Sequence, residues 1–287
     1  MWWKLRFEAP ELLAESAAWM IAEMLDHPVE IRDANTMSAS AAQTEVVVAF
    51  GERPDDTIDK QIRDALEPLG LSEVRIETTA SDDESWRDGW RAFFRGQQLS
   101  DKLWVGPPWE TPASEGVSIV IEPGQAFGTG THETTRGCLK VLEQVLSGRA
   151  SQLIMDVGCG SGVLSIAAAK LGHRADGIDI DADALKNAFE NVEINGVTES
   201  VHLSVGTAEG VKRTYGIVVA NILAKILVHE AESIGALASD ILILSGLLIE
   251  QHDLVVTAYP DFRVTHHWDE GVWRVLVMER RQSHDPS

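Results

Sequence analysis

The sequence predicts an α/β protein in two parts: a small N-terminal α+β domain, and a larger domain with a doubly wound parallel sheet closed by an antiparallel hairpin. Three observations predict this. Strand and helix patterns in residues 1–79 form two βαβ-like halves. From residue 113 onward such patterns alternate regularly, which is typical of a parallel sheet with helices on both faces. A stretch rich in acidic, aromatic and proline residues separates the two parts.

The first 79 residues contain four short apolar runs and two amphipathic segments. The runs predict strands at Trp3–Phe7, Val29–Ile31, Val46–Phe50 and Val74–Thr78. Apolar residues that recur at helical spacing predict helices from Pro10 to Met24 and from Ile58 to Leu66. This order of elements predicts a ferredoxin-like module. We assign residues 1–79 to that domain, 80–111 to a linker and 112–287 to the second domain.

Residues 80–111 have the character of a connector. The acidic start, SDDES, is suited to capping a helix, and four aromatic side chains then fall on one helical face: Trp86, Trp90, Phe93 and Phe94. An aromatic stripe at this spacing more often packs in a core than around a ligand. We interpret it as a brace between the domains.

The second domain alternates strands and helices. Its predicted strands are Val117–Ile121, Leu153–Val157, Arg174–Ile180, Val201–Val205, Gly216–Ala220, Ile241–Ser245, Phe262–His267 and Val272–Met278. Its predicted helices are Glu133–Leu146, Gly162–Leu171, Ala182–Ile194, Ile226–Leu237 and Leu248–Ala258. A short turn at Asp269–Gly271 joins the last two strands into a hairpin, which adds an antiparallel strand at the edge of the sheet.

The net charge of −21 bears on the partner. A surface of this sign repels a phosphate backbone, so we expect no direct nucleic-acid binding and favour a basic protein partner. Excess acid that merely keeps the protein in solution is the alternative, and the charge alone leaves both open.

Targeting and redox signals are sparse. Acidic residues at Glu8, Glu11 and Glu15 interrupt the region that a signal peptide would need apolar, and no apolar run is long enough to cross a bilayer. The two cysteines, Cys138 and Cys159, form neither a disulfide framework nor a metal-ligand spacing. We therefore expect a cytoplasmic protein without a membrane span or a bound metal.

The sequence LIMDVGCGSG, residues 153–162, carries the central chemical signal. An apolar strand ends in Asp156, and Gly158, Gly160 and Gly162 lead directly into a helix. Glycines let the backbone turn tightly and approach a bound nucleotide, as in Rossmann-like sheets. Asp179 follows at the tip of the next strand, where an acid can accept hydrogen bonds from both ribose hydroxyls.

The glycine spacing and the acid before it favour a particular nucleotide. Dinucleotide sites prefer GxGxxG, whereas this turn is GxGxG with Val163 next. The carboxylate of Asp156 would also face an anionic pyrophosphate unfavourably. S-adenosylmethionine carries a sulfonium and an ammonium group and no phosphate, so a nearby carboxylate favours its binding. We expect this cofactor at the turn, with Asp156, Gly158, Gly160 and Asp179 binding it.

A glycine- and threonine-rich segment, EPGQAFGTGTHETT at residues 122–135, lies between a strand and a helix. Such a segment would cross the mouth of the glycine turn. Thr134 and Thr135 stand at the helix start, where a hydroxyl can cap the helix or bind a ligand. His132 is a proton acceptor or a structural histidine, and the sequence leaves its role open.

The strand Val218–Ala220 ends at Asn221. Because the carboxyl ends of strands line the ligand crevice of an open α/β sheet, Asn221 is expected where the methyl group meets its acceptor. Its amide oxygen would orient an incoming amine. Methyl transfer from a sulfonium needs positioning and a neutral nitrogen, so we expect no dedicated base. Asn221 is our candidate catalytic residue.

These motifs, with GIDIDADAL, NAFENVEINGV and VVANILA, resemble the ribosomal protein L11 methyltransferases of the PrmA type. The resemblance covers residues 80–287 well and the first 79 residues mainly in layout. It implies a ferredoxin-like domain that recognises the substrate and a domain that methylates the α-amino group and lysines of a large-subunit ribosomal protein. It also implies cofactor contacts at Thr135, Gly158, Asp179 and Asn221.

Other functions remain open at this point. Related enzymes methylate lysines of other proteins, and a small-molecule acceptor would leave the N-terminal domain unexplained. A nucleobase acceptor is disfavoured, because Ile-Leu-Ala follows Asn221 and offers no ring for stacking. A protein that binds the cofactor without catalysis fits least, since all the motifs are intact.

Overall fold

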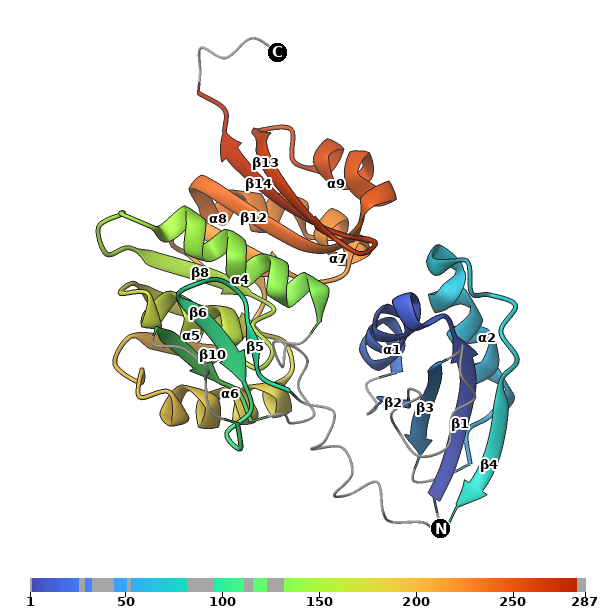
Figure 1. The fold of residues 1–287 in the computed structure, drawn as a ribbon. Helices are drawn as coiled ribbons and strands as arrows, with labels where there is room; N and C mark the ends of the chain where they lie inside the picture. The colour runs from blue at the N-terminus through green and yellow to red at the C-terminus, as the bar shows by residue number, and fades with distance from the viewer. Residues whose placement is uncertain are drawn as a thin grey trace. The chain divides into compact units, whose positions relative to one another are not determined.

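The structure, a computed structural model, describes residues 2–25, 29–32, 44–50, 53–81, 95–110, 116–122 and 132–282 (Figure 1). Contacts divide the chain into two compact units, residues 1–93 and 94–287. The first unit has one hydrophobic core and the second has two, one on each face of its main sheet.

The first unit is a four-stranded antiparallel sheet with two helices. Its elements are β1 (Trp2–Ala9), α1 (Glu11–Leu25), β2 (Val29–Arg32), β3 (Thr44–Phe50), α2 (Asp56–Leu66), the 3-10 helix η1 (Glu67–Leu69) and β4 (Glu77–Ser81). The strand order β2-β3-β1-β4 confirms the ferredoxin-like layout. Along β1, Leu5 and Phe7 are buried in the core, with Ile21 of α1 and Ile62 of α2.

The last strand of this unit starts later than the sequence pattern predicted. The sequence placed it at Val74–Thr78, whereas β4 begins at Glu77. Arg63 of α2 explains the difference, because its Nη1 donates to the carbonyl oxygens of Ser72 and Val74, each at 2.8 Å. These backbone groups are thereby held against α2 ahead of the strand.

The second unit contains a seven-stranded sheet in the order β10-β9-β8-β11-β12-β14-β13. Its strands are β8 (Leu153–Val157), β9 (Arg174–Asp179), β10 (Val201–Val205), β11 (Tyr215–Asn221), β12 (Ala238–Leu248), β13 (Phe262–Glu270) and β14 (Trp273–Arg280). Neighbouring strands from β10 to β12 are parallel, and β14 is antiparallel to β12 and β13. The doubly wound sheet with a closing hairpin is confirmed. The antiparallel strand is inserted next to the edge, and β13 forms the edge itself.

Helices cover both faces of this sheet. One core contains side chains of α4 (Glu133–Leu146), α5 (Val163–Lys170) and α6 (Ala182–Ile194), and the other contains those of α7 (Ala224–His229), α8 (Ala231–Leu237) and α9 (His252–Ala258). The strands alternate between the two cores: in β11, Ile217 and Val219 join the first, while Val218 and Ala220 join the second. No helix in the described part of the chain is long and apolar enough to span a bilayer.

Two predicted helices are divided in the structure. The segment predicted as one helix from Ile226 to Leu237 is α7 followed by α8, with Glu230 outside helical geometry at ψ 13°. The segment predicted from Leu248 to Ala258 begins as the 3-10 helix η4 (Ile249–Gln251). Leu248 itself belongs to β12, because it pairs with Trp273 of β14. Another 3-10 helix, η3 (Ala208–Gly210), follows β10.

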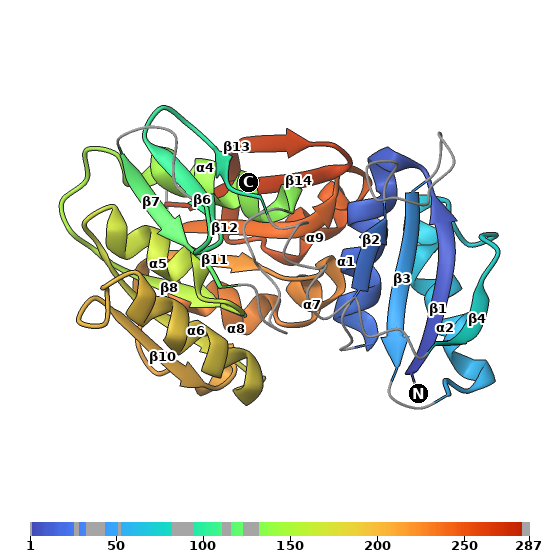
Figure 2. The same cartoon turned by 60° about the horizontal axis from the view of Figure 1, so that its bottom comes forward.

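A separate three-stranded sheet includes part of the stretch predicted as a linker. It consists of β5 (Gln97–Gln98), β6 (Leu103–Gly106) and β7 (Val117–Val120), with β6 and β7 parallel. Leu103 and Val105 are buried in the core shared with α4 and α5, and α5 packs against β7 (Figure 2). Residues 95–110 therefore belong to the second unit. The predicted aromatic stripe at 86–94 lies outside the described residues.

Candidate active site

The glycine turn follows β8 at the carboxyl edge of the sheet. Gly158, Gly160 and Gly162 have φ values of 70°, 51° and 79°, in the left-handed region that favours glycine. The backbone N–H groups of Gly158 and Cys159 donate to the carbonyl oxygen of Ile178, at 2.8 and 3.0 Å. Helix α5 begins directly after Gly162. The turn is thus bonded to the end of β9 and leads into a helix N-terminus.

Asp179 at the end of β9 lies directly beside this turn. Its Oδ2 accepts the Gly160 N–H at 2.8 Å, and its Oδ1 accepts the Asp181 N–H at 3.0 Å. A carboxylate has about four lone-pair sites, so two backbone bonds leave acceptor capacity for a ligand. The side chain is half-buried, which keeps it accessible at the edge. The structure therefore brings together the glycine turn and the acid that the sequence separates by 19 residues.

Two exposed apolar residues flank Asp179. Ile180 is 77% exposed and Val205, which pairs with Asp179 in the sheet, is 60% exposed. Large apolar side chains exposed at the carboxyl edge of a sheet offer a surface on which a flat ring can pack. Our sequence reasoning missed these two residues. The sequence signal that could have pointed to this apolar surface is Ile180, an apolar residue between the acidic Asp179 and Asp181.

Asp156 is buried beneath the turn. Only 1% of the residue is exposed, and Oδ2 accepts hydrogen bonds from the Ser165 N–H at 3.1 Å and the Ser165 hydroxyl at 2.7 Å. Burial raises the pKa of Asp156 to about 7, and the negative charge of Asp179 adds to the increase. We expected this carboxylate to bind the cofactor. In the structure Oδ2 bonds the start of α5, and Oδ1 is buried without a hydrogen-bond partner among the described residues.

Asn221 ends β11, the strand next to β8. Its Nδ2 donates to the hydroxyl of Thr135 in the first turn of α4, at 3.3 Å. Both residues are buried, Thr135 completely and Asn221 with 9% exposed. The amide oxygen Oδ1 is buried and has no hydrogen-bond partner among the described residues. A buried amide oxygen without a donor is costly, so this atom is suited to receive an N–H from a ligand.

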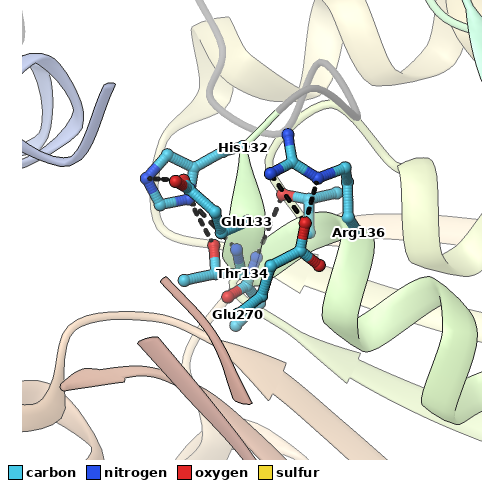
Figure 3. Close-up of polar contacts among 7 residues, drawn as sticks. His132, Glu133, Thr134, Arg136 and Glu270 are labelled. Carbon is cyan, nitrogen blue, oxygen red and sulfur yellow. Dashed lines mark hydrogen bonds and ion pairs between the residues drawn. The ribbon is translucent and has the colours of Figure 1, made fainter. Parts of the chain in front are cut away.

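His132 caps the helix that carries Thr135. Its Nδ1 accepts the Thr134 N–H at 3.2 Å and lies 2.8 Å from the Thr134 hydroxyl (Figure 3). Because a backbone N–H only donates, the ring hydrogen is on Nε2, which lies 3.5 Å from Oε2 of Glu133. Burial lowers the pKa of His132 to about 3, so the ring is neutral near pH 7. Its acceptor nitrogen is thus engaged in the cap of α4.

An ion pair ties the same helix to the closing hairpin. Arg136 donates from Nε to Oε1 of Glu270, the last residue of β13, at 2.8 Å, and its Nη2 is also 2.8 Å from that oxygen (Figure 3). Lys140 Nζ lies 3.5 Å from the other oxygen of Glu270. The contact joins residues 134 positions apart, so no local pattern in the sequence could have revealed it.

Residues 123–131 of the glycine- and threonine-rich segment lie outside the described residues.

A family model described as ribosomal protein L11 methyltransferase (PrmA) matches residues 1–281. The ribosomal protein L11 methyltransferase of Streptococcus pneumoniae (strain 70585) is 34% identical over 286 residues, covering 94% of this chain and 89% of that protein. The chain belongs to the ribosomal protein L11 methyltransferase family.

Other members of this methyltransferase family agree with the assignment. The protein from Streptococcus pneumoniae (strain JJA) is 34% identical over 287 residues, covering 94% of this chain and 89% of that protein. A solved ribosomal protein L11 methylase from Lactobacillus delbrueckii subsp. bulgaricus has a TM-score of 0.60 and 28% identity, covering 66% of this chain and 100% of that one. The chain is therefore a methyltransferase, and S-adenosylmethionine is its methyl donor.

The residues at the carboxyl edge of this methyltransferase fit that cofactor. Asp179 has acceptor capacity for ribose hydroxyls, and Ile180 and Val205 offer apolar surface for a purine. The positive φ of Gly158 lets the backbone come close to a ligand. Asp156 bonds Ser165 at the start of α5, just beyond the glycine turn. Thr135 is completely buried and its hydroxyl meets Asn221.

Proposed function

We propose that this methyltransferase transfers methyl groups to amino groups of ribosomal protein L11, at lysine side chains, the α-amino group or both. The family assignment and the names of the relatives support this acceptor. One structural observation supports the chemistry: Asn221 presents a buried amide oxygen without a partner among the described residues, one strand away from the glycine turn. An amine N–H is the donor that this oxygen lacks.

Asn221 would act by orientation. When bound, the cofactor supplies a methyl group already activated on a sulfonium. Thr135 holds Nδ2 of Asn221, so Oδ1 accepts a hydrogen bond from the amine and directs the nitrogen lone pair toward the methyl carbon. Such alignment lowers a barrier by up to roughly 7–11 kcal/mol. Asn221 is thus the residue that we propose as catalytic.

The acceptor nitrogen must be neutral to react. Reference pKa values are about 10.4 for lysine and about 7.7–8.0 for an α-amino group. Contact with a side chain as buried as Asn221 strips water from the amine, which lowers its pKa. His132 has its acceptor nitrogen engaged in the helix cap. We therefore propose that desolvation, without a dedicated base, supplies the neutral amine.

The charge supports a basic protein partner and disfavours nucleic acid. The net charge is −21, and residues 1–79 hold 7 basic and 16 acidic residues. A negative surface attracts a basic ribosomal protein and repels a phosphate backbone. We propose that the ferredoxin-like unit recognises the substrate, and that the enzyme acts in the cytoplasm, where a ribosomal substrate is made.

Labelled S-adenosylmethionine tests the proposal. The purified chain is incubated with ribosomal protein L11 and with other ribosomal proteins, and mass spectrometry locates each methyl group. We expect label on amino nitrogens of L11, and a loss of turnover of at least tenfold in Asn221→Ala at saturating cofactor. Label on another protein or on a small molecule would contradict the acceptor. Cofactor binding without any methylation would identify a non-catalytic binder.

A further inference from the structure

Helix α6 carries Asn187 and Asn191, and Asn195 caps its C-terminal end, so the three asparagines follow one another at intervals of four residues. All three bond to the backbone of residues 120–122, at the end of β7 and just after it. Asn195 bonds to Val120 through both its oxygen and its nitrogen, at 2.9 and 2.6 Å. Asn187 donates to the Glu122 carbonyl oxygen at 3.1 Å. The row therefore fastens this segment to α6.

Asn191, in the middle of the row, makes a contact that its neighbours in the row lack in the described structure. Its Oδ1 accepts the Glu122 N–H at 2.8 Å, and its Nδ2 donates to the carbonyl oxygen of Ser161 in the glycine turn, at 3.0 Å. Both Asn191 and Ser161 are 0% exposed. One buried amide thus joins the segment after β7 to the turn.

The glycine turn is consequently held from two sides. Asp179 accepts the Gly160 N–H, while Asn191 donates to the carbonyl oxygen of the next residue, Ser161. The turn also lies close to α6, since a Cβ at Gly162 would be 3.4 Å from that of Ala188. Together these contacts fix the peptide groups that we expect to approach the cofactor.

We infer that Asn191 is a positioning residue for cofactor binding, which it supports by holding the Ser161 carbonyl and hence the glycine turn in its binding geometry. This inference rests on the proposed location of the cofactor at the turn. Loss of the Nδ2 donor removes this hydrogen bond from the buried Ser161 carbonyl, and the turn is then held less firmly in its geometry. Cofactor affinity falls as a result.

Asn195 provides a matched control. Its Oδ1 accepts a backbone N–H and its Nδ2 donates to two backbone oxygens, those of Val120 and Asn191, yet among the described residues it makes no hydrogen bond to the turn. Asn→Asp at either position keeps the acceptor oxygen and removes the donor. Each variant therefore loses two hydrogen bonds, to Ser161 and Asn187 in Asn191→Asp and to Val120 and Asn191 in Asn195→Asp, and only Asn191→Asp removes the bond to Ser161.

Calorimetry with S-adenosylmethionine, combined with thermal unfolding, tests the inference. Both variants should unfold at lower temperature, and only Asn191→Asp should raise the cofactor Kd, by about tenfold. Equal Kd values for the two variants would overturn it. If either Asp variant fails to fold, Asn191→Ala and Asn195→Ala are compared in the same way. A wild-type chain that binds no S-adenosylmethionine would instead overturn the cofactor assignment.

Discussion

Asn221 and Thr135 are joined by a hydrogen bond of 3.3 Å between Nδ2 and Oγ1, although 86 residues separate them in the chain. This bond engages the nitrogen end of the amide. With the nitrogen engaged by Thr135, the oxygen is the end left for a ligand. The orientation of the proposed catalytic amide is therefore set by the first turn of α4.

We predict that Thr135→Val lowers kcat by about tenfold or more. Valine keeps the shape of threonine and removes the hydroxyl, so the amide of Asn221 is free to rotate and the amine loses its orientation. The cofactor Kd should change less than about threefold. Initial rates with saturating acceptor, together with calorimetry, measure the two effects separately.

Thr134→Val is the control for that change. Thr134 is equally buried and adjacent, but its hydroxyl contacts His132. We expect this variant to lose some stability and keep its kcat. An increase in cofactor Kd without a change in kcat in Thr135→Val would show that Thr135 serves the cofactor, as the family resemblance implies.

Local signals explain which elements could be predicted. Helices α4 and α6 begin and end at the predicted residues, because each combines an apolar stripe with a side chain that caps its start, His132 for α4 and Asp181 for α6. Strand β6 was missed because its four buried residues, LWVG, are too few for a period to emerge.

In the candidate site, one contact could likewise be predicted from the sequence and one side-chain direction could not. The contact between Asp179 and Gly160 could be predicted, because adjacent parallel strands bring their carboxyl ends together. The direction of Asp156 could not, since it depends on Ser165 one helical turn beyond the glycines. Residue types at a strand end indicate a site, whereas packing decides which of them face the ligand.

The ion pair between Arg136 and Glu270 leads to a second prediction. Glu270→Gln should lower the free energy of unfolding by about 1–3 kcal/mol, because it replaces the charged acceptor of the mostly buried Arg136 by a neutral amide. It should also lower kcat, since Arg136 directly follows Thr135 on α4. Denaturant unfolding and initial rates provide the two measurements.

Asp269→Asn is the matched control for Glu270→Gln. Asp269 is the neighbouring residue, and it pairs with Arg274 at 2.7 and 2.6 Å within the hairpin, without contact to α4 in the described structure. It should lose stability and retain kcat. Equal kcat values in the two variants would show that the pair with Arg136 is only structural.

Gly246 gives a third prediction. Its φ is +83°, and a Cβ there would lie 2.2 Å from the carbonyl oxygen of Ile222, the residue after Asn221. Gly246→Ala should therefore displace Ile222 and reduce kcat together with stability. Gly172, with φ +92° and open space around it, is the control: Gly172→Ala should cost only about 1–2 kcal/mol of backbone strain. Wild-type kcat in Gly246→Ala would refute the prediction.

The pKa of Asp156 leads to a pH-dependent prediction. Burial raises this pKa from 3.8 to about 7. Between pH 3.8 and about pH 7, Asp156 holds a proton in the folded protein and has released it in the unfolded chain. The contribution of Asp156 to the free energy of unfolding is therefore greatest below about pH 4 and is lost as the pH rises to about 7. The amide of the Asp156→Asn variant does not titrate. The stability of this variant relative to wild type should thus increase with pH, by about 2 kcal/mol between pH 5.5 and pH 7.5, and then stay level.

Urea unfolding at pH 5.5, 6.5, 7.5 and 8.5 measures this difference for Asp156→Asn. Asp183→Asn is the control: a hydrogen bond from Lys186 holds the pKa of Asp183 below its ordinary range, so that carboxylate stays ionised throughout the window. Removal of the Asp183 carboxylate should change the free energy of unfolding by the same amount at all four pH values. If the curve of Asp156→Asn also ran parallel to wild type, the buried carboxyl would be charged at every pH tested. The hydrogen bonds from Ser165 would then outweigh the cost of burying the charge.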